Sequence, residues 1–270
     1  MALTYYLKSL KIRLKFLGSK NLLVANLYSS IGSAWRTLGE YEKAIGFYKK
    51  SLSLTKMLVG TEHPAVARAY SKIGRVLESY GDYKMAFSYF ERGLKIQVNL
   101  FGINHIEVAT SYSNIGSIYR SYGDYSKALE FQELALNIKL KILGHNHPSL
   151  LADYNNIGGT LSSKGCIIEA IRFFKRSLRI QVKALGDKHP SLAAIYYNIG
   201  TSFKNLGNYR KAIEYYIKTK DIQVSVFGSS HTHVASTYSD LGELYDMIGN
   251  VTKAREYYKL GLTIQLKYLN

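Results

Sequence analysis

Apolar residues recur along this chain at the spacing of helix faces. In residues 103–144, Tyr112, Ile115 and Tyr119 stand at i, i+3 and i+7, which places them on one side of a helix. A second apolar set follows after Gly123–Asp124: Ala128, Phe131, Leu136 and Ile138. Glycine often ends a helix in the left-handed conformation, and aspartate often caps the next one. The pattern therefore predicts two helices joined by a tight turn.

This two-helix pattern repeats with a period of 42 residues. Glycines mark the period: Gly18, Gly60, Gly102, Gly144, Gly186 and Gly228. Because a fixed period of this size indicates a repeat architecture, we predict one all-α repeat domain over residues 1–270. It consists of a half repeat and six full repeats, numbered 1 to 6: residues 1–18, then 19–60, 61–102, 103–144, 145–186, 187–228 and 229–270.

Glycine is concentrated at three positions of the repeat. These positions hold 18 of the 22 glycines, and two of the three are helix ends. The third lies inside each first helix: Gly32, Gly74, Gly116, Gly158, Gly200 and Gly242. A glycine inside a helix costs about 1 kcal/mol relative to alanine, so its recurrence needs a reason. We expect the paired second helix to approach closely at this point.

The repeat resembles the tetratricopeptide repeat. Repeat 5 carries that family's pattern of aromatic, small and aliphatic positions: Tyr196, Ile199, Gly200, Phe203, Ala212, Tyr216 and Thr219. The usual period is about 34 residues, so each helix here is longer by about one turn. This length, with openings such as GHNHPSLLADYNNIG, resembles the repeats of kinesin light chains. The resemblance implies a right-handed superhelical solenoid of antiparallel helix pairs that binds proteins and catalyses nothing.

The chain also departs from the kinesin light chain pattern. Paired asparagines occur only at Asn155–Asn156, and the interior helix position holds glycine where alanine is typical. No heptad pattern for a coiled coil is present in the sequence. The expectation is therefore a relative of the cargo-binding domain and not a kinesin subunit.

No group of residues in the sequence has the spacing of a catalytic, cofactor or metal site. Histidine recurs once per repeat, but each copy belongs to a different repeat, so a helix-entry turn is favoured over metal binding: His63, His105, His147, His189 and His231. Cys166, the single cysteine, stands at a helix-capping position without a neighbouring base. The glycines mark helix ends and do not form a phosphate-binding loop. We predict no enzyme activity, no cofactor and no metal.

The resemblance implies that the first helices line a concave groove. Family members often place asparagine just before the interior Ile or Leu, where it holds the backbone of a bound peptide; here Asn114, Asn156 and Asn198 occupy this position. Asparagine can both donate and accept, which suits an extended chain. The alternative is that these asparagines pair between adjacent helices.

The charged residues of the first helices change from basic to acidic along the chain. Repeat 2 has a basic stripe, Arg68, Lys72 and Arg75, while repeat 6 has an acidic one, Asp240, Glu243 and Asp246. Neighbouring inward positions hold Arg36, Arg120 and Lys204. A partly acidic extended peptide fits this gradation, and the alternative is an ordinary solvated helix surface.

The formal net charge of +17 resides on the other set of helices. The second helices and the half repeat carry 27 of the 36 Lys and Arg but 8 of the 19 Asp and Glu. Nucleic acid or an anionic membrane could bind such a convex face, but the charge is diffuse and we favour a protein partner. A regulatory fragment of a larger signalling protein is a further alternative.

The remaining expectations concern location and the ends of the chain. No signal peptide or membrane span is indicated, and one cysteine fits a reducing compartment, so we expect a cytoplasmic protein. Neither terminal helix has the polar outer face of a capping repeat. Either the chain is part of a longer array, or its ends self-associate.

Overall fold

The computed structural model describes residues 2–267, which form thirteen α-helices and one short 3₁₀ helix, with no strand among them. The elements are α1 (Ala2–Leu17), α2 (Leu22–Thr37), α3 (Tyr41–Val59), α4 (Pro64–Tyr80), α5 (Tyr83–Phe101), α6 (Ile106–Ser121), α7 (Tyr125–Leu143), η1 (Pro148–Leu150), α8 (Leu151–Ser163), α9 (Ile167–Leu185), α10 (Leu192–Asn205), α11 (Tyr209–Phe227), α12 (Thr232–Met247) and α13 (Val251–Lys267). Two compact halves, Met1–Ile142 and Leu143–Asn270, divide the chain at the end of α7.

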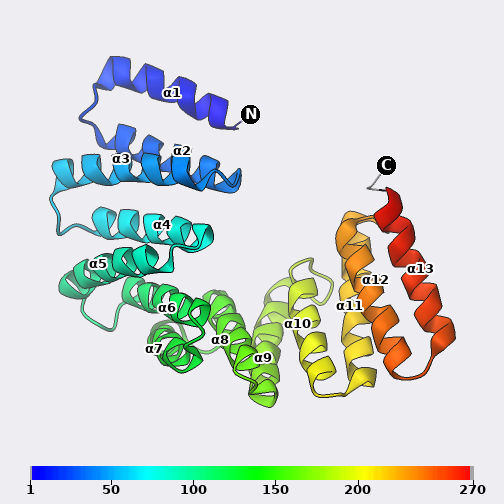
Figure 1. Ribbon diagram of the computed structural model, residues 1–270. Helices are drawn as coiled ribbons and strands as arrows, with labels where there is room; N and C mark the ends of the chain where they lie inside the picture. The colour runs from blue at the N-terminus through cyan, green and yellow to red at the C-terminus, as the bar shows by residue number, and fades with distance from the viewer. Residues whose placement is uncertain (1, 268–270) are drawn as a thin grey trace. The chain divides into compact units, whose positions relative to one another are not determined.

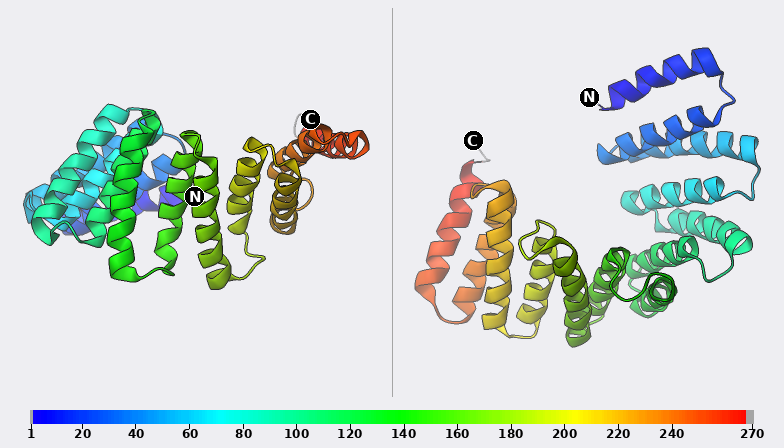
Figure 2. Two further views of the ribbon diagram at one scale, coloured as in Figure 1. Left: turned by 90° about the horizontal axis from the view of Figure 1, so that it is seen from below. Right: turned by 180° about the vertical axis from the view of Figure 1, so that it is seen from behind.

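Each full repeat is a pair of helices, as the sequence predicts. Within each half, successive helices pack side by side, and Figure 1 shows that they alternate in direction. Figure 2 shows the same succession from below and from behind. The even-numbered helices are the first helices of the repeats, and the odd-numbered ones from α3 onward are the second helices. In the N-terminal half, a single apolar core that includes Ala44, Val66, Phe90 and Ile115 joins α3 to α6.

The recurring histidines begin the first helices. The Nδ1 atom of His63 accepts a hydrogen bond from the backbone N–H of Ala65 at 3.1 Å, and His105 accepts one from Glu107 at 3.2 Å. His147, His189 and His231 make the same contact two residues ahead. Each bond satisfies a backbone donor that the helix leaves unpaired. The helix-entry role expected from the sequence is confirmed.

The turns between paired helices also follow the expectation. Asp82 and Asp124 accept hydrogen bonds from the N–H groups of Met85 and Lys127, and Asn208 and Asn250 do the same in repeats 5 and 6. The twelve terminal glycines adopt φ between 71° and 93°. Because this region strains any residue with a side chain, these positions favour glycine.

The interior glycines lie where the two helices of a repeat come closest. A Cβ atom added at Gly74 would stand 2.7 Å from the ring of Phe90, and one at Gly158 would stand 2.7 Å from Phe174. Gly32, Gly116 and Gly242 are similarly restricted, with nearest atoms at 2.7–3.1 Å. At Gly200 the nearest atom is 3.4 Å away, an ordinary contact. The expected close approach is present in five repeats and relaxed in repeat 5.

This difference gives a paired prediction for alanine at the interior position. Gly74→Ala should lower the free energy of unfolding by about 1 kcal/mol or more, because overpacking costs roughly 1–3 kcal/mol and exceeds the gain in helix propensity. Gly200→Ala should be neutral or should raise it by up to about 1 kcal/mol. Urea denaturation of both variants tests this, and equal effects would show that helix proximity does not select the glycines.

Candidate ligand-binding surface

All twelve candidate residues lie on first helices. In the N-terminal half, α2 carries Arg36, α4 carries Arg68, Lys72 and Arg75, and α6 carries Asn114 and Arg120. In the C-terminal half, α8 carries Asn156, α10 carries Asn198 and Lys204, and α12 carries Asp240, Glu243 and Asp246. The three asparagines are half-buried, and the arginines of α2 and α4 are exposed. Each half therefore has its own set of candidate groups.

Side chains of neighbouring first helices meet at two fixed offsets. The Lys72 Nζ donates to Ser29 Oγ at 2.6 Å, 43 residues away, and Tyr197 OH donates to Asp240 Oδ2 at 3.1 Å over the same separation. The second offset is 39 residues. There, Ser117 Oγ donates to Glu78 at 2.5 Å and Lys204 Nζ donates to Glu243 at 2.6 Å. A residue on one first helix therefore lies opposite a residue of the next first helix that is 43 or 39 positions further along the chain. These are one position after and three positions before its equivalent in the next repeat.

The acidic stripe of repeat 6 is engaged with repeat 5. Lys204 and Glu243 form an ion pair, and Asp240 accepts the hydrogen bond from Tyr197. Burial raises the pKa of the Asp240 carboxyl, while the Tyr197 hydrogen bond and the Lys204 charge oppose that shift. Burial, with the Asp240 charge, also raises the pKa of Tyr197. Two of the three acids expected to meet a ligand are thus held by α10.

In the basic stripe of repeat 2, Lys72 donates to Ser29 of α2, but none of the three basic residues forms an ion pair within the described residues. Arg36 and Arg75 occupy the two positions, 39 residues apart, that Lys204 and Glu243 occupy in repeats 5 and 6, so like charges stand where an ion pair is formed elsewhere. Partial burial, and to a smaller extent the charge of Arg68, lowers the pKa of Lys72. Within residues 2–267, Arg36, Arg68 and Arg75 form no ion pair. We call Arg36, Arg68, Lys72 and Arg75 the basic cluster.

The side-chain amides of the three asparagines are unused in the described part of the chain. Thr160 and Ser202 bond to the backbone carbonyls of Asn156 and Asn198, but no side-chain hydrogen bond involves Asn114, Asn156 or Asn198. The interhelical pairing considered as an alternative is absent from these residues. Asn155, which the 43-residue offset places toward Asn198, has a buried Oδ1 without a hydrogen-bond partner.

Sequence reasoning missed the groups that pair with the candidates. Ser29, which pairs with Lys72, and Tyr197, which pairs with Asp240, carry no distinctive motif. One signal of these contacts was present in the sequence. Lys204 and Glu243 have opposite charges and stand 39 residues apart, three fewer than the period. This signal identifies a pair only after the stagger between neighbouring first helices is known.

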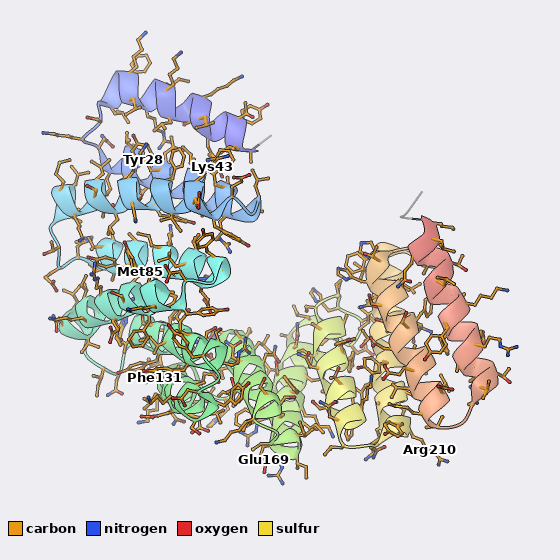
Figure 3. All side chains as sticks on the ribbon, in the orientation of Figure 1. Tyr28, Lys43, Met85, Phe131, Glu169 and Arg210 are labelled. Atoms are coloured by element: carbon orange, nitrogen blue, oxygen red, sulfur yellow. The ribbon has the colours of Figure 1, made fainter. Side chains whose placement is uncertain are left out.

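Basic side chains of the second helices lie over aromatic rings. Lys43, labelled in Figure 3, is 4.6 Å from the centroid of the Trp35 ring, and Lys56 is 4.8 Å from that of Tyr70. Arg92, Arg176 and Lys218 lie within 5.7 Å of tyrosine or phenylalanine rings. Cation–π attraction therefore gives part of the basic charge a structural role.

Residues 2–267 contain neither a membrane-spanning helix nor a cluster of metal-ligating side chains. No helix in this range has the length and apolar character needed to cross a membrane. The same residues contain no group of three or more His, Cys, Asp or Glu side chains that could hold a metal ion.

The pattern of helix pairs, caps and glycines has a counterpart in known proteins. The tetratricopeptide repeat profile matches this sequence in six overlapping windows: residues 1–57, 31–97, 66–141, 107–180, 149–218 and 193–267. The chain belongs to the tetratricopeptide repeat family. Proteins of this family are generally scaffolds for protein–protein interaction and are typically not enzymes. A comparison with curated protein sequences gave no match.

Solved structures with similar folds include kinesin light chain-like proteins. The kinesin light chain-type repeats of Podosopora anserina are 25% identical with a TM-score of 0.68, covering 77% of this chain and 98% of theirs. BtubC (BKLC) of P. vanneervenii is 18% identical with a TM-score of 0.75, covering 85% and 92%. A chain of the APC/C hetero-tetramer Cut9-Hcn1 is 16% identical with a TM-score of 0.66, covering 97% of this chain and 43% of its own. The similarity to the last two concerns the fold alone.

The raised pKa of Asp240 predicts how stability depends on pH. A carboxyl whose pKa is higher in the folded state stabilises the fold below the unfolded pKa and loses that contribution as the pH rises. Asp240→Asn should keep the Tyr197 hydrogen bond and avoid burying a charge. Its free energy of unfolding should exceed that of the wild type at pH 7, and the gap should close as the pH falls toward about 3.9. Denaturation across pH measures this; Asp246→Asn, at an exposed position of the same helix, is the control, and a gap independent of pH would contradict the assignment.

Proposed function

We propose that this protein is a scaffold or adaptor that binds an extended, partly acidic segment of another protein along its first helices. The observation that carries the proposal is the set of half-buried asparagine amides, Asn114, Asn156 and Asn198, that bond to nothing within the described residues. An extended peptide exposes unpaired backbone N–H and C=O groups at regular intervals. An amide that offers both a donor and an acceptor suits that backbone.

The basic cluster supplies the preference for an acidic ligand. Its arginines have no internal counter-charge, and Arg36 and Arg75 occupy opposed positions that hold an ion pair in repeats 5 and 6. A carboxylate between them would relieve the repulsion and accept charge-assisted hydrogen bonds. The protein would act in the cytoplasm, where such a segment of a partner is accessible.

A polyanion on the second helices is the competing function. Because several of these cations lie over rings of the protein itself, part of the charge already has an internal role. Binding of nucleic acid or anionic lipid should weaken steeply with salt and should depend on residues such as Lys175 and Arg179. Self-association through the ends of the chain would appear as a molecular mass in solution that rises with protein concentration.

The asparagine positions give the first test. Peptides selected by the wild-type protein from a random library serve as ligands in fluorescence anisotropy. Asn156→Ala should weaken their binding about five- to a hundred-fold, since a lost hydrogen bond is worth about 1–3 kcal/mol, and should leave thermal stability nearly unchanged. Asn205→Ala, at an exposed position near the end of α10, is the matched control. Unfolding of Asn156→Ala with retained binding would show that the asparagine is structural.

The basic cluster gives the second test. Arg75→Glu should weaken acidic peptides by about tenfold or more and should make the remaining affinity less sensitive to salt, because a screened attraction has been removed. Arg210→Glu makes the same charge change at an exposed position of a second helix and should have little effect. Equal losses in both variants would point to a general charge effect and against a site at α4.

A further inference from the structure

Helix α9 carries a single exposed stripe of basic residues. Its buried side chains include Phe174 and Ile180, on the side that packs against α8 and α10. On the opposite side, Arg and Lys recur at i, i+4, i+7 and i+11, the spacing of one helix face: Arg172, Arg176, Arg179 and Lys183. All four are exposed, and we call them the α9 stripe. Within residues 2–267, none of them forms an ion pair or a side-chain hydrogen bond.

The positive charge of the α9 stripe does not continue onto the next second helix. Helix α9 has five basic residues and one acidic residue, Glu169, which is labelled in Figure 3. The equivalent positions of the stripe on α11 hold Glu214, Lys218, Asp221 and Ser225. The two acids among them are exposed, so the sign of the charge is reversed at two of the four positions. An anionic ligand that extended from α9 to α11 would therefore be repelled there.

An exposed isoleucine stands at the start of the α9 stripe. Ile168 lies one helical turn before Arg172 and is 57% exposed. The other full repeats have polar or charged residues at this position: Glu42, Lys84, Ser126, Arg210 and Thr252. A partner that covers Ile168 would gain the free energy of removing apolar surface from water. One apolar residue and four cations thus form a line about 22 Å long, at 1.5 Å per residue.

The spacing of the α9 stripe distinguishes between anionic ligands. From Arg172 to Lys183 the stripe spans about 16 Å. A ligand helix has the same rise per residue, so acids at i, i+4, i+7 and i+11 would each lie level with a cation. An extended segment has same-side residues about 6.6 Å apart, so its fourth acid would pass the last cation by about 4 Å. A nucleic acid gains affinity from many phosphate contacts, and the acids of α11 limit those contacts to one helix.

We propose that the α9 stripe binds an α-helical segment of another protein that has acidic residues at i, i+4, i+7 and i+11 and an apolar residue one turn beyond that row. A second copy of this chain does not supply such a helix. Its most acidic described helix is α12, which has three acids, and two of these, Asp240 and Glu243, are bonded to α10. The site lies on a second helix, so it is independent of the peptide surface proposed for the first helices.

The probe is a fluorescent, end-capped, alanine-rich helical peptide with glutamate at these four positions and leucine one turn beyond each end. It should bind the wild-type protein in an anisotropy titration at low ionic strength, and added salt should weaken the binding. A peptide of the same composition with its glutamates distributed around the helix should bind about fivefold more weakly or worse. Ile168→Ala should weaken the aligned peptide several-fold but should not affect a version without the leucines.

Charge reversal on α9 tests the site itself. Arg172→Glu with Arg179→Asp copies the charges that α11 carries at these positions, so the variant should keep the helical circular dichroism of the wild type. It should weaken the aligned peptide about tenfold or more. Arg210→Glu with Arg255→Asp makes the same change in net charge at exposed positions of α11 and α13 and should have little effect. Asn156→Ala should also leave this binding unchanged, which separates the site from the proposed peptide surface.

Four results would overturn the proposal. The first is absence of binding of the aligned peptide, and the second is equal affinity for the aligned and the redistributed peptide, because charge alone would then explain the binding. The third is an equal loss in the two double variants. The fourth is tighter binding of single-stranded RNA or of phosphatidylserine vesicles than of the aligned peptide, with loss of that binding in the Arg172→Glu, Arg179→Asp variant, which would assign the stripe to a polyanion.

Discussion

The structure depends on the packing of paired helices at the interior glycine of each first helix, which in five of the six repeats is a close contact with the second helix. At Gly74 and Gly158 the partner is a phenylalanine ring that leaves no room for a Cβ atom. This contact sets the distance between the two backbones. Once that distance is short, small residues follow at the next crossing, as at Ser51 and Gly93. The helix propensity lost at each glycine is offset by apolar area buried between the helices.

The pairing of backbones leaves the solvent side of the first helices free to vary. Apolar residues and glycine fix the positions of the helices. The residues that are 39 or 43 positions apart on neighbouring first helices are therefore brought together, whatever their chemical type. In repeats 5 and 6 these are Lys204 and Glu243, an ion pair, and in repeats 1 and 2 they are Arg36 and Arg75, two like charges. The same geometry thus brings opposite charges together in one place and places two arginines at the corresponding positions in another, where we propose that an anion binds.

The period, the helix pairs, the caps and the reason for the glycines could all be predicted from the sequence, because each is a local requirement that recurs. Gly39 and Gly81 end helices for the same reason, whatever surrounds them. The pairing of Lys204 with Glu243 could not be predicted, because it depends on the stagger between helices of neighbouring repeats, which no single helix pattern contains. The looser packing at Gly200 was hidden for a similar reason: the identical residue stands in a different environment.

The two facing positions also bear on how repeats can be rearranged. The glycine contact lies within a repeat, so any repeat carries it into any order. The bonds of Lys72 with Ser29 and of Tyr197 with Asp240 belong to junctions, and each needs its own pair of neighbours. A shuffled array of the same six repeats would keep its helix pairs but lose these junctions. Duplication of a repeat in place preserves the period. Exchange of distant repeats instead loses specific side-chain contacts at every new boundary. The polar and charged residues of the first helices therefore favour one order of the repeats.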